Sequence, residues 1–363
     1  MGFSCGIVGL PNVGKSTLFN ALTNASVSAL NFPFCTVEPN VGIVSVPDKR
    51  LDRIAEIASV PKTVPTTMRF VDIAGLIHGA SKGEGLGNKF LAHIREVDAI
   101  AHVVRCYEDE NVAHVDGSVD PSRDVDVVNT ELLLSDLERS ERIRDKLRRL
   151  ANSGDKAART ELEALDSVVL QMNEGVPLRA MKSTTESEEL LQSWEFLTST
   201  PVMYVANLGE RDLAGNSHFD ALCEVATSEN ALCVAFCGEV EAEMQGLDEE
   251  EQSEFLEDLG LVGSGLARIV DAGYNLLGLH HFFTTNQEEV RAWTIPQGTI
   301  AVHAAGRIHT DFERGFIRAD VIEYEDFVSH KGEQGAKSAG KWRLESRDYV
   351  VQDGDVIYFR FNV

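Results

Sequence analysis

Short apolar runs recur along the first two thirds of the chain, and each run ends at a polar or glycine-rich turn. Helical patterns separate several of these runs, which is typical of a parallel sheet with crossover helices. Ligands of such sheets bind at the carboxyl ends of the strands, so we expect the functional residues directly after the runs. The predicted strands cover residues 3–8, 69–71, 99–104, 201–206 and 231–236.

A long helical pattern lies between the third and the fourth run, on a highly charged background. Its apolar residues recur near helical spacing on both sides of a turn at 151–155, and they are Leu133, Leu137, Ile143, Leu147, Leu150, Leu162, Leu165, Val169 and Met172. Two such helices joined by a short loop predict an antiparallel hairpin, inserted over residues 128–199 and projecting from the sheet domain. Ordinary surface helices packed on the core remain the alternative.

The pattern changes from Gly278 onward to short, alternating, β-rich runs. These runs cover residues 299–303, 315–321, 349–351 and 355–361, and they predict a small β-rich domain at 278–363. Before this domain, residues 239–258 hold ten acidic side chains and no Lys or Arg. Such a run is typical of a solvated helix or loop.

The charge balance of the chain limits its partners. The 363 residues include 58 acidic and 33 basic side chains, for a net charge of −25, and 43% of the residues are hydrophobic. A chain of this length and hydrophobic content can bury a sizeable core in two or three domains. Its overall field repels nucleic acid and anionic lipid, so an RNA contact requires a local patch and no DNA partner is expected. Residues 278–363 hold 10 basic and 13 acidic side chains and therefore carry only −3 of the net charge of −25. This difference in charge from the rest of the chain indicates a module with different partners.

Six scattered cysteines indicate a reducing compartment. None of them forms a C-x-x-C pair, and no cluster of Cys and His has zinc spacing. No stretch approaches the roughly 20 apolar residues of a membrane span, and the first residues lack the basic flank of a signal peptide. We therefore expect a cytoplasmic protein without a membrane partner. We also expect a monomer.

A phosphate-binding motif follows the first apolar run. The sequence GLPNVGKST at residues 9–17 matches G-x-x-x-x-G-K-[ST] between a strand and a helix. The glycines let backbone N–H groups point at phosphate oxygens, with the helix N-terminus behind them. Lys15 then reaches the β- and γ-phosphates, and the Ser16 hydroxyl ligates Mg²⁺. The predicted nucleotide-binding residues of this loop are Asn12, Val13, Gly14, Lys15, Ser16 and Thr17.

Two further sequence motifs indicate an NTPase that acts as a nucleotide-dependent switch. The sequence D-x-x-G at residues 72–75 ends an apolar strand, where Asp72 can hold Mg²⁺ through water and Gly75 can offer its amide to the γ-phosphate. Thr36 stands in the loop NFPFCTVEPN at residues 31–40, which can swing onto the metal. A purely structural hydroxyl is the alternative for Thr36. The predicted catalytic residues are Lys15, Thr36 and Gly75.

These three segments together resemble the Obg-related NTPases. They are GLPNVGKST, NFPFCTVEPN and DIAGLIHGASKGEGLGNKFL at residues 72–91, and with them the chain closely resembles the YchF subfamily of Obg-like ATPases along essentially its whole length. The resemblance implies an α/β fold, a P-loop NTPase doubly wound sheet built from residues 1–127 and 200–277. It also implies a coiled-coil arm at 128–199 and a small β-rich TGS domain at 278–363. Ribosome association, with a role in translation or stress response, is implied in the same way.

The base site departs from the guanine motif N-K-x-D. After the strand at 201–206 the chain reads Asn207, Leu208, Gly209 and Glu210. Leu208 can cover a base as the lysine stem does, whereas Glu210 is one methylene longer than aspartate and crowds the guanine edge. The residues alone support relaxed specificity, and the resemblance implies ATP over GTP. An Obg-type GTPase and a nucleotide-gated RNA-binding protein with slow hydrolysis remain alternatives.

Leu76 stands where many GTPases carry a water-positioning glutamine. An apolar side chain cannot orient a water, so unassisted hydrolysis should be slow. His78 and His114 are conceivable substitutes, although each is better explained as structural or exposed. Asn12 suggests K⁺ as a second cofactor beside Mg²⁺, because the asparagine at this position of related NTPases helps to bind K⁺.

A basic patch in the C-terminal module is the candidate contact with ribosomal RNA. Lys331, Lys337, Lys341 and Arg343 flank Trp342 on a glycine-rich stretch. Basic groups beside an aromatic ring suit contact with the RNA backbone and stacking on a base. The alternative is a solvated loop whose tryptophan caps a small core.

Overall fold

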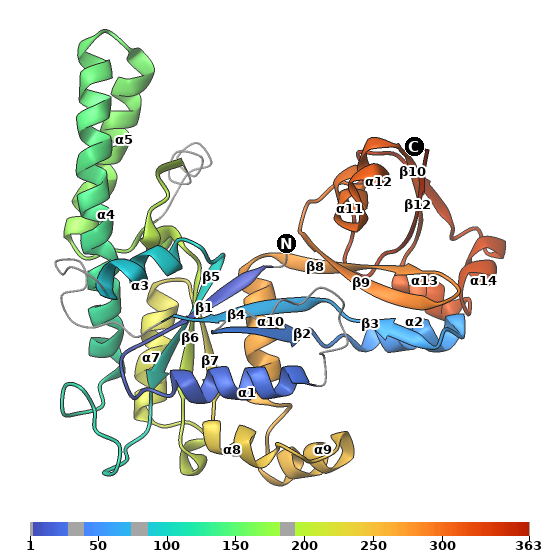
Figure 1. Ribbon diagram of the computed structural model, residues 1–363, viewed down its shortest axis with the longest axis horizontal. Coiled ribbons are helices and arrows are strands. Elements are labelled where there is room, and N and C mark those ends of the chain that lie inside the picture. Colours follow the sequence, from blue (N-terminus) through green and yellow to red (C-terminus); the bar gives the residue numbers. More distant parts are fainter. Residues whose placement is uncertain (1–2, 28–39, 74–85, 182–192, 363) are drawn as a thin grey trace. The chain divides into compact units, whose positions relative to one another are not determined.

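The computed structural model describes residues 3–27, 40–73, 86–181 and 193–362. The chain forms two compact units (Figure 1). The α/β unit comprises Phe3–Val44 and Arg69–Leu276, and the β-rich unit comprises Ser45–Met68 and Leu277–Val363 together with the first two residues. Within the described residues, no helix is both long and apolar enough to cross a membrane.

A six-stranded sheet forms the centre of the α/β unit, in the order β2-β4-β1-β5-β6-β7. Its strands are β1 (Ser4–Val8), β2 (Val41–Ser45), β4 (Thr67–Asp72), β5 (Ala99–Arg105), β6 (Val202–Asn207) and β7 (Leu232–Phe236). From β4 to β7 all neighbours are parallel, and every residue of β1, β5 and β6 is buried. The five predicted strands are confirmed, and β2 is an edge strand that the apolar runs did not reveal.

Helices connect and cover these strands. They are α1 (Lys15–Val27), α3 (Leu86–Ile94), α4 (Pro121–Asn152), α5 (Lys156–Asn173), α7 (Ser217–Ser228), α8 (Gly238–Glu243), α9 (Glu249–Asp258) and α10 (Gly265–Leu276). Three short 3₁₀ helices, η1 (Leu178–Ala180), η2 (Leu197–Ser199) and η3 (Glu210–Asp212), join them. The acidic stretch forms α8 and α9, and it is not wholly solvated, because Val240, Met244 and Leu256 are buried in a small core.

The predicted helical hairpin is confirmed. Helix α4 contacts β5 and α7 and buries Val125 and Val128 in its first half, and its second half pairs with α5, as Figure 1 shows. Leu147 and Leu165 lie in the core between the two helices. Because α4 is continuous from Pro121, the arm has no separate boundary at residue 128.

A buried polar network fixes the base of this hairpin to the sheet. The carboxylate of Glu229 accepts hydrogen bonds from Asn129 of α4 (2.8 Å), Arg179 of η1 (2.8 Å) and the hydroxyl of Tyr204 in β6 (2.7 Å). A buried carboxylate with this many donors holds its surroundings in one arrangement, because losing a neutral donor leaves a buried acceptor unsatisfied and losing Arg179 leaves a buried charge unpaired.

The β-rich unit is built on a second sheet, in the order β11-β10-β12-β8-β9-β3. Its elements are α2 (Lys49–Ala58), β3 (Lys62–Val64), β8 (Leu279–Thr285), β9 (Glu289–Pro296), α11 (Ala301–Ile308), α12 (Thr310–Arg314), β10 (Phe316–Ile322), α13 (Tyr324–Ser329), α14 (Glu333–Ser338), β11 (Arg343–Glu345) and β12 (Val356–Phe361). Side chains from these elements form two hydrophobic clusters, one that includes α2 and α13 and one that includes α11.

Two features of this unit differ from the sequence prediction. Residues 45–68, which the prediction placed with the NTPase domain, pack with the C-terminal segment: β3 pairs with β9, and Leu51 and Ile54 of α2 lie in one core with Phe283. The predicted strand at 299–303 is wrong, because Ile300 is the N-cap of helix α11 and residues 301–303 form the first turn of that helix. Three buried alanines at positions 301, 304 and 305 give that segment a helical rather than an alternating pattern.

Of the other three runs predicted as strands in this unit, two are confirmed and one is not. Residues 315–321 and 355–361 correspond to β10 and β12, as predicted. Residues 349–351 form no named strand, and Val350 makes only an isolated bridge to Ile300.

Candidate functional site

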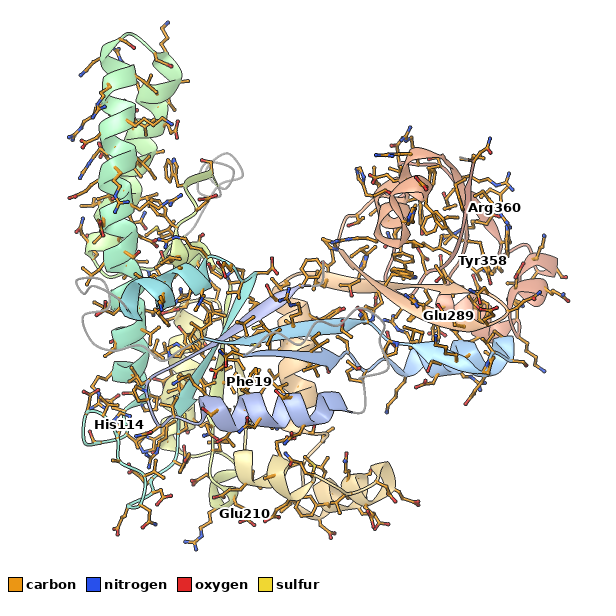
Figure 2. All side chains as sticks on the ribbon, in the orientation of Figure 1. Phe19, His114, Glu210, Glu289, Tyr358 and Arg360 are labelled. Atoms are coloured by element: carbon orange, nitrogen blue, oxygen red, sulfur yellow. The ribbon has the colours of Figure 1, made fainter. Side chains whose placement is uncertain are left out.

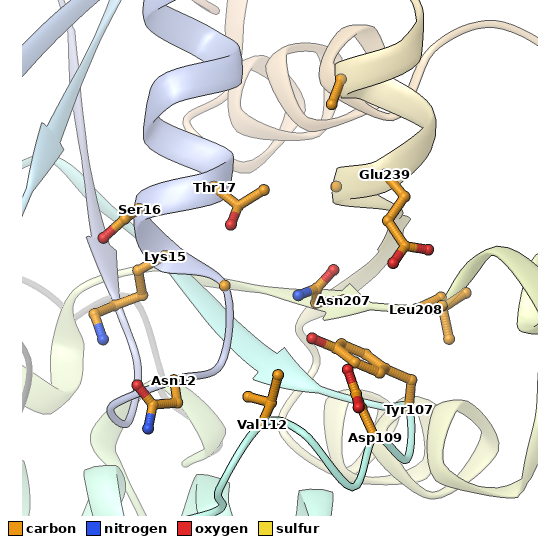
Figure 3. Close-up of a pocket in the computed structure, with 14 residues that line it drawn as sticks. Asn12, Lys15, Ser16, Thr17, Tyr107, Asp109, Val112, Asn207, Leu208 and Glu239 are labelled. Carbon is orange, nitrogen blue, oxygen red and sulfur yellow. The ribbon is translucent and has the colours of Figure 1, made fainter.

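A cavity of about 590 Å³, lined by both polar and apolar groups, lies at the carboxyl ends of four strands of the α/β unit (Figure 3). Its walls come from the segments that follow β1, β5, β6 and β7, which is the place where parallel sheets bind ligands. The lining residues are Asn12, Gly14, Lys15, Ser16, Thr17, Tyr107, Asp109, Val112, Asn207, Leu208, Gly209, Gly238, Glu239 and Ala242. The structure thus brings the phosphate motif and the base motif of the sequence into one cavity.

The loop after β1 packs so tightly that two of its residues must be glycine. A Cβ on Gly9 would lie 2.4 Å from the carbonyl oxygen of Val103, and one on Gly14 would lie 2.2 Å from Nδ2 of Asn207. Both glycines also have positive φ angles, 148° and 101°. Asn207 donates from Nδ2 to the carbonyl oxygen of Val13 (3.0 Å), so the base motif holds the phosphate loop directly.

Lys15 and Asp72 are electrostatically coupled at the phosphate end. Lys15 donates from Nζ to the carbonyl oxygen of Leu10 (2.7 Å). Burial lowers the pKa of Lys15, and the charge of Asp72 opposes that shift. Burial raises the pKa of Asp72, and Lys15 in turn opposes it. Asp72 ends β4 beside β1 and is not among the residues that line the cavity.

The wall that faces the base motif was not apparent from the sequence. Arg105, the last residue of β5, is buried and donates to the carbonyl oxygens of Tyr107 (3.0 Å), Asp109 (3.1 Å) and Val112 (2.8 Å). Its guanidinium also lies over the Tyr107 ring, 4.7 Å from the centroid. One buried charge therefore shapes the 107–112 loop. The signal in the sequence was an arginine at the end of a strand whose other residues, except His102, are apolar.

Two glutamates lie near the base end, and only one lines the cavity. Glu210 is exposed at the start of η3 and is absent from the lining, whereas Leu208 lines the cavity although it is only 3% exposed. Glu239 comes from the first turn of α8. Figure 3 shows its carboxylate directed into the cavity near Asn207 and Leu208. The interpretation of 239–258 as a solvated run concealed this residue.

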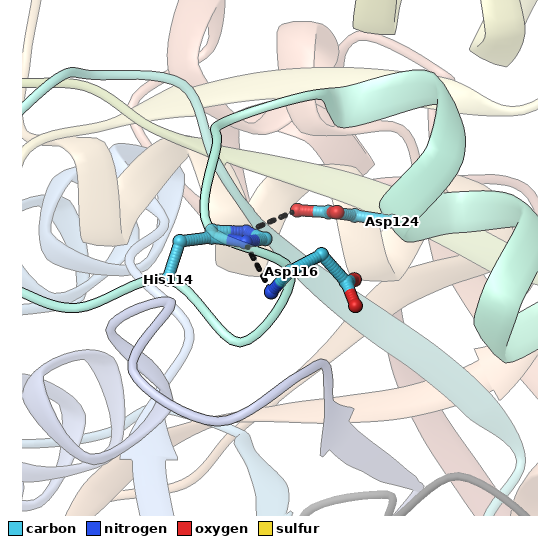
Figure 4. A group of neighbouring side chains, drawn as sticks. All are labelled: His114, Asp116 and Asp124. Carbon is cyan, nitrogen blue, oxygen red and sulfur yellow. Dashed lines mark hydrogen bonds and ion pairs between the residues drawn. The ribbon is translucent and has the colours of Figure 1, made fainter.

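His114 is held by its own segment (Figure 4). Its Nε2 lies 2.8 Å from a carboxylate oxygen of Asp124, and its Nδ1 accepts from the backbone N–H of Asp116 (3.2 Å). Both ring nitrogens are engaged, which supports a structural role. His114, Asp116 and Asp124 also offer three atoms close enough to share a metal ion. Next to them, the carbonyl oxygen of Ala113 accepts from Nδ2 of Asn12 (3.2 Å).

Four residues singled out from the sequence lie outside the described part of the chain. They are Thr36, Gly75, Leu76 and His78. Every other predicted site residue is described.

Comparisons with known proteins agree with this geometry. A family model described as a 50S ribosome-binding GTPase matches residues 4–134, and a model of the YchF GTPase C-terminal domain, described as a protein of unknown function (DUF933), matches residues 279–362. The chain is 54% identical to the ribosome-binding ATPase YchF of Haemophilus influenzae and 51% identical to that of Bacillus subtilis, in each case over 100% of both chains.

Solved structures give the same result. The structure of the YchF GTPase from Schizosaccharomyces pombe has a TM-score of 0.90 and 37% identity, covering 99% of this chain and 98% of that one. A GTP-binding protein from Pyrococcus horikoshii, at 20% identity and a TM-score of 0.62 over 99% and 100% of the two chains, shares the fold.

Proposed function

The chain belongs to the YchF family, and we propose that it is an ATP-hydrolysing protein that binds the ribosome. The observation that carries this function is a phosphate-loop cavity in a chain that aligns over its full length with ribosome-binding ATPases. Its place of action is then the cytoplasm, where ribosomes are, and its role is to regulate translation or the response to stress.

We assign nucleotide hydrolysis to the α/β unit. Backbone N–H groups of residues 13–17 surround the phosphates at the start of α1, where the helix dipole favours negative charge. Lys15 exchanges its bond to Leu10 for the β- and γ-phosphate oxygens. Thr36 and Gly75 keep the roles that their motifs imply, as a metal ligand and a γ-phosphate contact.

The oxygen donors at the phosphate end suit Mg²⁺. Ser16 lines the cavity with a hydroxyl, and Asp72 ends the neighbouring strand with a carboxylate that can act through water. Hard oxygen donors of this kind fit Mg²⁺, which keeps several of its waters. When bound, Mg²⁺ would neutralise charge on the β- and γ-phosphate oxygens. Asn12 is the proposed K⁺ ligand, through the Oδ1 that its bond to Ala113 leaves available.

We propose that the cavity prefers ATP to GTP. The residue that should pair with guanine in N-K-x-D is replaced by Glu210, which does not line the cavity, whereas the acidic residues that do line it are Asp109 and Glu239. GTP hydrolysis is the second candidate, because the S. pombe relative is titled a GTPase and the matching family model is described as one. We assign docking to the β-rich unit, as a TGS domain, and to the α4–α5 arm.

The test compares Lys15→Ala with Lys89→Ala, which removes an exposed lysine of α3 in the same unit. We expect Lys15→Ala to abolish phosphate release from ATP and Lys89→Ala to leave it unchanged. Affinities for ATP and GTP are measured side by side, and ribosome co-sedimentation is measured with ATP, with ADP and without nucleotide. Wild-type turnover in Lys15→Ala would place hydrolysis elsewhere, and absence of the wild-type protein from the ribosome pellet in all three states would refute ribosome binding.

A further inference from the structure

Two arginines of the β-rich unit share one buried carboxylate. Arg318 on β10 and Arg360 on β12 are directly opposite each other in the antiparallel register. Asp320 accepts from Nε of Arg318 at Oδ1 (2.9 Å) and from Nε of Arg360 at Oδ2 (2.8 Å). The Asp320 side chain is 2% exposed, whereas the arginine side chains are 48% and 54% exposed. The carboxylate is therefore inside, and the guanidinium ends reach the surface.

This arrangement leaves positive charge and hydrogen-bond donors without a partner. Like charges directly opposite each other on neighbouring strands destabilise a sheet, and a single carboxylate neutralises only one of the two. Each guanidinium carries five N–H donors and uses only the one on Nε here. For the Nη atoms, the described part of the chain offers no acceptor within hydrogen-bond distance. A planar group held at Nε loses little further freedom when its Nη atoms bind an anion, and phosphate fits this fork.

The surroundings of Arg360 extend the same chemistry. Arg360 and Lys331 line a cavity of about 620 Å³ together with Tyr358 and the amide side chains of Asn286 and Gln287. Figure 2 labels Tyr358 and Arg360 on β12. The Tyr358 ring stacks on Trp342, with centroids 5.2 Å apart. The cavity thus combines two cations, amides and an aromatic ring, with Glu333 as the one acidic side chain of its lining.

The basic patch predicted from the sequence is different in this respect. Lys341 is paired with Asp326 (3.3 Å), and Arg343 is within 2.8 Å of Glu323 and 3.5 Å of Glu345. These acids neutralise the charge that the glycine-rich stretch displays in the sequence. Lys337 lies over the Trp342 ring, 5.1 Å from its centroid.

We propose that Arg318 and Arg360, held by Asp320, form a phosphate-binding surface through which the β-rich unit docks on ribosomal RNA. The inference rests on the proposed ribosome binding and assigns a surface to it. Charge complementarity supports RNA as the occupant, because a chain of net charge −25 approaches a polyanion only through a local excess of positive charge. The backbone phosphates of RNA supply the acceptors that the Nη atoms lack.

The experiment compares two double variants that remove the same charge from the same unit. Arg318→Gln with Arg360→Gln removes the proposed surface, and Lys341→Gln with Arg343→Gln removes the neutralised pair. Ribosome co-sedimentation is measured over a range of salt concentrations, and binding of a labelled single-stranded RNA is measured by anisotropy. We expect the first double variant to flatten the log–log salt slope by about 1.4 units, the value for two phosphate contacts on a single strand, and the second to change it little. ATP turnover off the ribosome should be unchanged in both.

The two single variants separate a loss of RNA contacts from unfolding of the β-rich unit. Removing both arginines leaves Asp320 buried without a counter-charge, which can destabilise the unit. Arg318→Gln and Arg360→Gln made separately each leave one guanidinium on Asp320, and each should flatten the slope by about 0.7 units. An unchanged slope in both single variants, or an equal effect of the two double variants, would overturn the proposal.

Two further outcomes separate this inference from the function on which it rests. Weaker ribosome binding with unchanged RNA affinity would show that the surface contacts a ribosomal protein, and this would overturn the assignment to RNA. A wild-type protein that fails to sediment with ribosomes would refute the proposed function itself.

Discussion

Arg105 organises one wall of the cavity by placing a permanent charge at the end of a buried strand. Its three bonds all go to backbone carbonyls, so the shape of the 107–112 loop depends on that side chain. Within the loop, the Asp109 carboxylate adds a bond from the backbone N–H of Asn111 (2.8 Å). The apolar side chain of methionine would leave three carbonyls unsatisfied. Hydrogen bonds to a charged group contribute about 1.5–3 kcal/mol, so the loop would lose its fixed conformation.

We predict that Arg105→Met weakens ATP binding by about 10-fold or more, corresponding to about 1.4 kcal/mol, through the base end alone. The affinity for inorganic tripolyphosphate should stay unchanged, because the phosphate loop does not depend on Arg105. Titration calorimetry with both ligands measures the difference. Arg211→Met, which removes an exposed arginine of η3, is the control. Equal losses for ATP and tripolyphosphate would show that Arg105 supports the whole unit and not the base end.

Glu239 is the residue at which we expect base selection to be decided. We place Glu239 beside the 6-position of the purine. A carboxylate only accepts hydrogen bonds, so at that position it accepts from the amino group of adenine and is repelled by the O6 of guanine. We predict that Glu239→Gln reduces the preference for ATP over GTP by about 1–3 kcal/mol, the scale of a hydrogen bond to a charged group. Glu210→Gln, which changes an exposed glutamate three residues after Asn207, should leave the ratio of the two affinities unchanged. A ratio that responds to Glu210 and not to Glu239 would contradict the assignment.

At the scale of elements, α2 shows how a helix can belong to a unit far away in the sequence. Its N-cap, Asp48, accepts from the backbone N–H of Arg50 (2.9 Å) and lies 2.9 Å from Nδ1 of His281 on β8. Arg50 in turn donates to Asp353 (2.8 Å). Burial tends to raise the pKa of Asp48, but the hydrogen bonds from His281 and Arg50 outweigh it and hold that pKa well below its usual range.

We predict that Asp48→Ala destabilises the β-rich unit by about 2–4 kcal/mol, which combines the loss of a helix cap with that of a charge-assisted hydrogen bond. Because the folded-state pKa of Asp48 is lowered, its contribution is present at neutral pH and is lost as the pH falls below the ordinary carboxyl range. Denaturant unfolding between pH 7 and pH 3 should therefore show a smaller loss of stability on acidification in the variant. Asp52→Ala, at an exposed position of the same helix, is the control. Parallel pH profiles for Asp48→Ala and the wild type would contradict the prediction.

The elements that the sequence predicted are those whose burial is complete or strictly periodic. β1, β5 and β6 are buried on both faces and therefore read as continuous apolar runs, and the α4–α5 hairpin has a clear helical period. The phosphate loop was predictable because its chemistry fixes both residue types and spacing. Residues 299–303 were misassigned because a run of five residues does not distinguish a strand from the first turn of a helix.

Local sequence patterns could not reveal which residues contact each other when they lie far apart in the chain. The place of Glu239 in the cavity depends on β7 lying beside β6, and the neutralisation of Arg343 depends on acids up to 20 residues away in the chain. The membership of 45–68 in the β-rich unit depends on contacts with residues more than 200 positions later. A hydrophobic pattern predicts that a helix buries one face, but it does not say against which partner.

At the scale of the whole molecule, the β-rich unit is assembled from two separate segments of the chain. Phe283, Val290 and Ala292 share their core with Leu51 and Ile54 of α2. We predict that a fragment of residues 277–363 alone does not fold stably, because it exposes that half of its core, and that fusing residues 45–68 to its N-terminus through a flexible linker restores the fold. The dispersion of amide resonances and a cooperative melting transition distinguish the two fragments. A stable fold of 277–363 alone would show that the β-rich unit does not need α2 and β3 in order to fold.

The same division has a consequence during synthesis of the protein. Residues 45–68 leave the translating ribosome roughly 210 residues before the segment against which they pack begins, and at about 5–20 residues per second this is a delay of about 10–40 s. Throughout that interval the apolar face of α2 and the pairing edge of β3 have no native partner, whereas β2 and β4, the strands that flank this segment, already have theirs within reach. During this time the nascent chain exposes the apolar face of α2, between two strands that can already pair. We expect this face to be bound by a chaperone that acts before synthesis is complete.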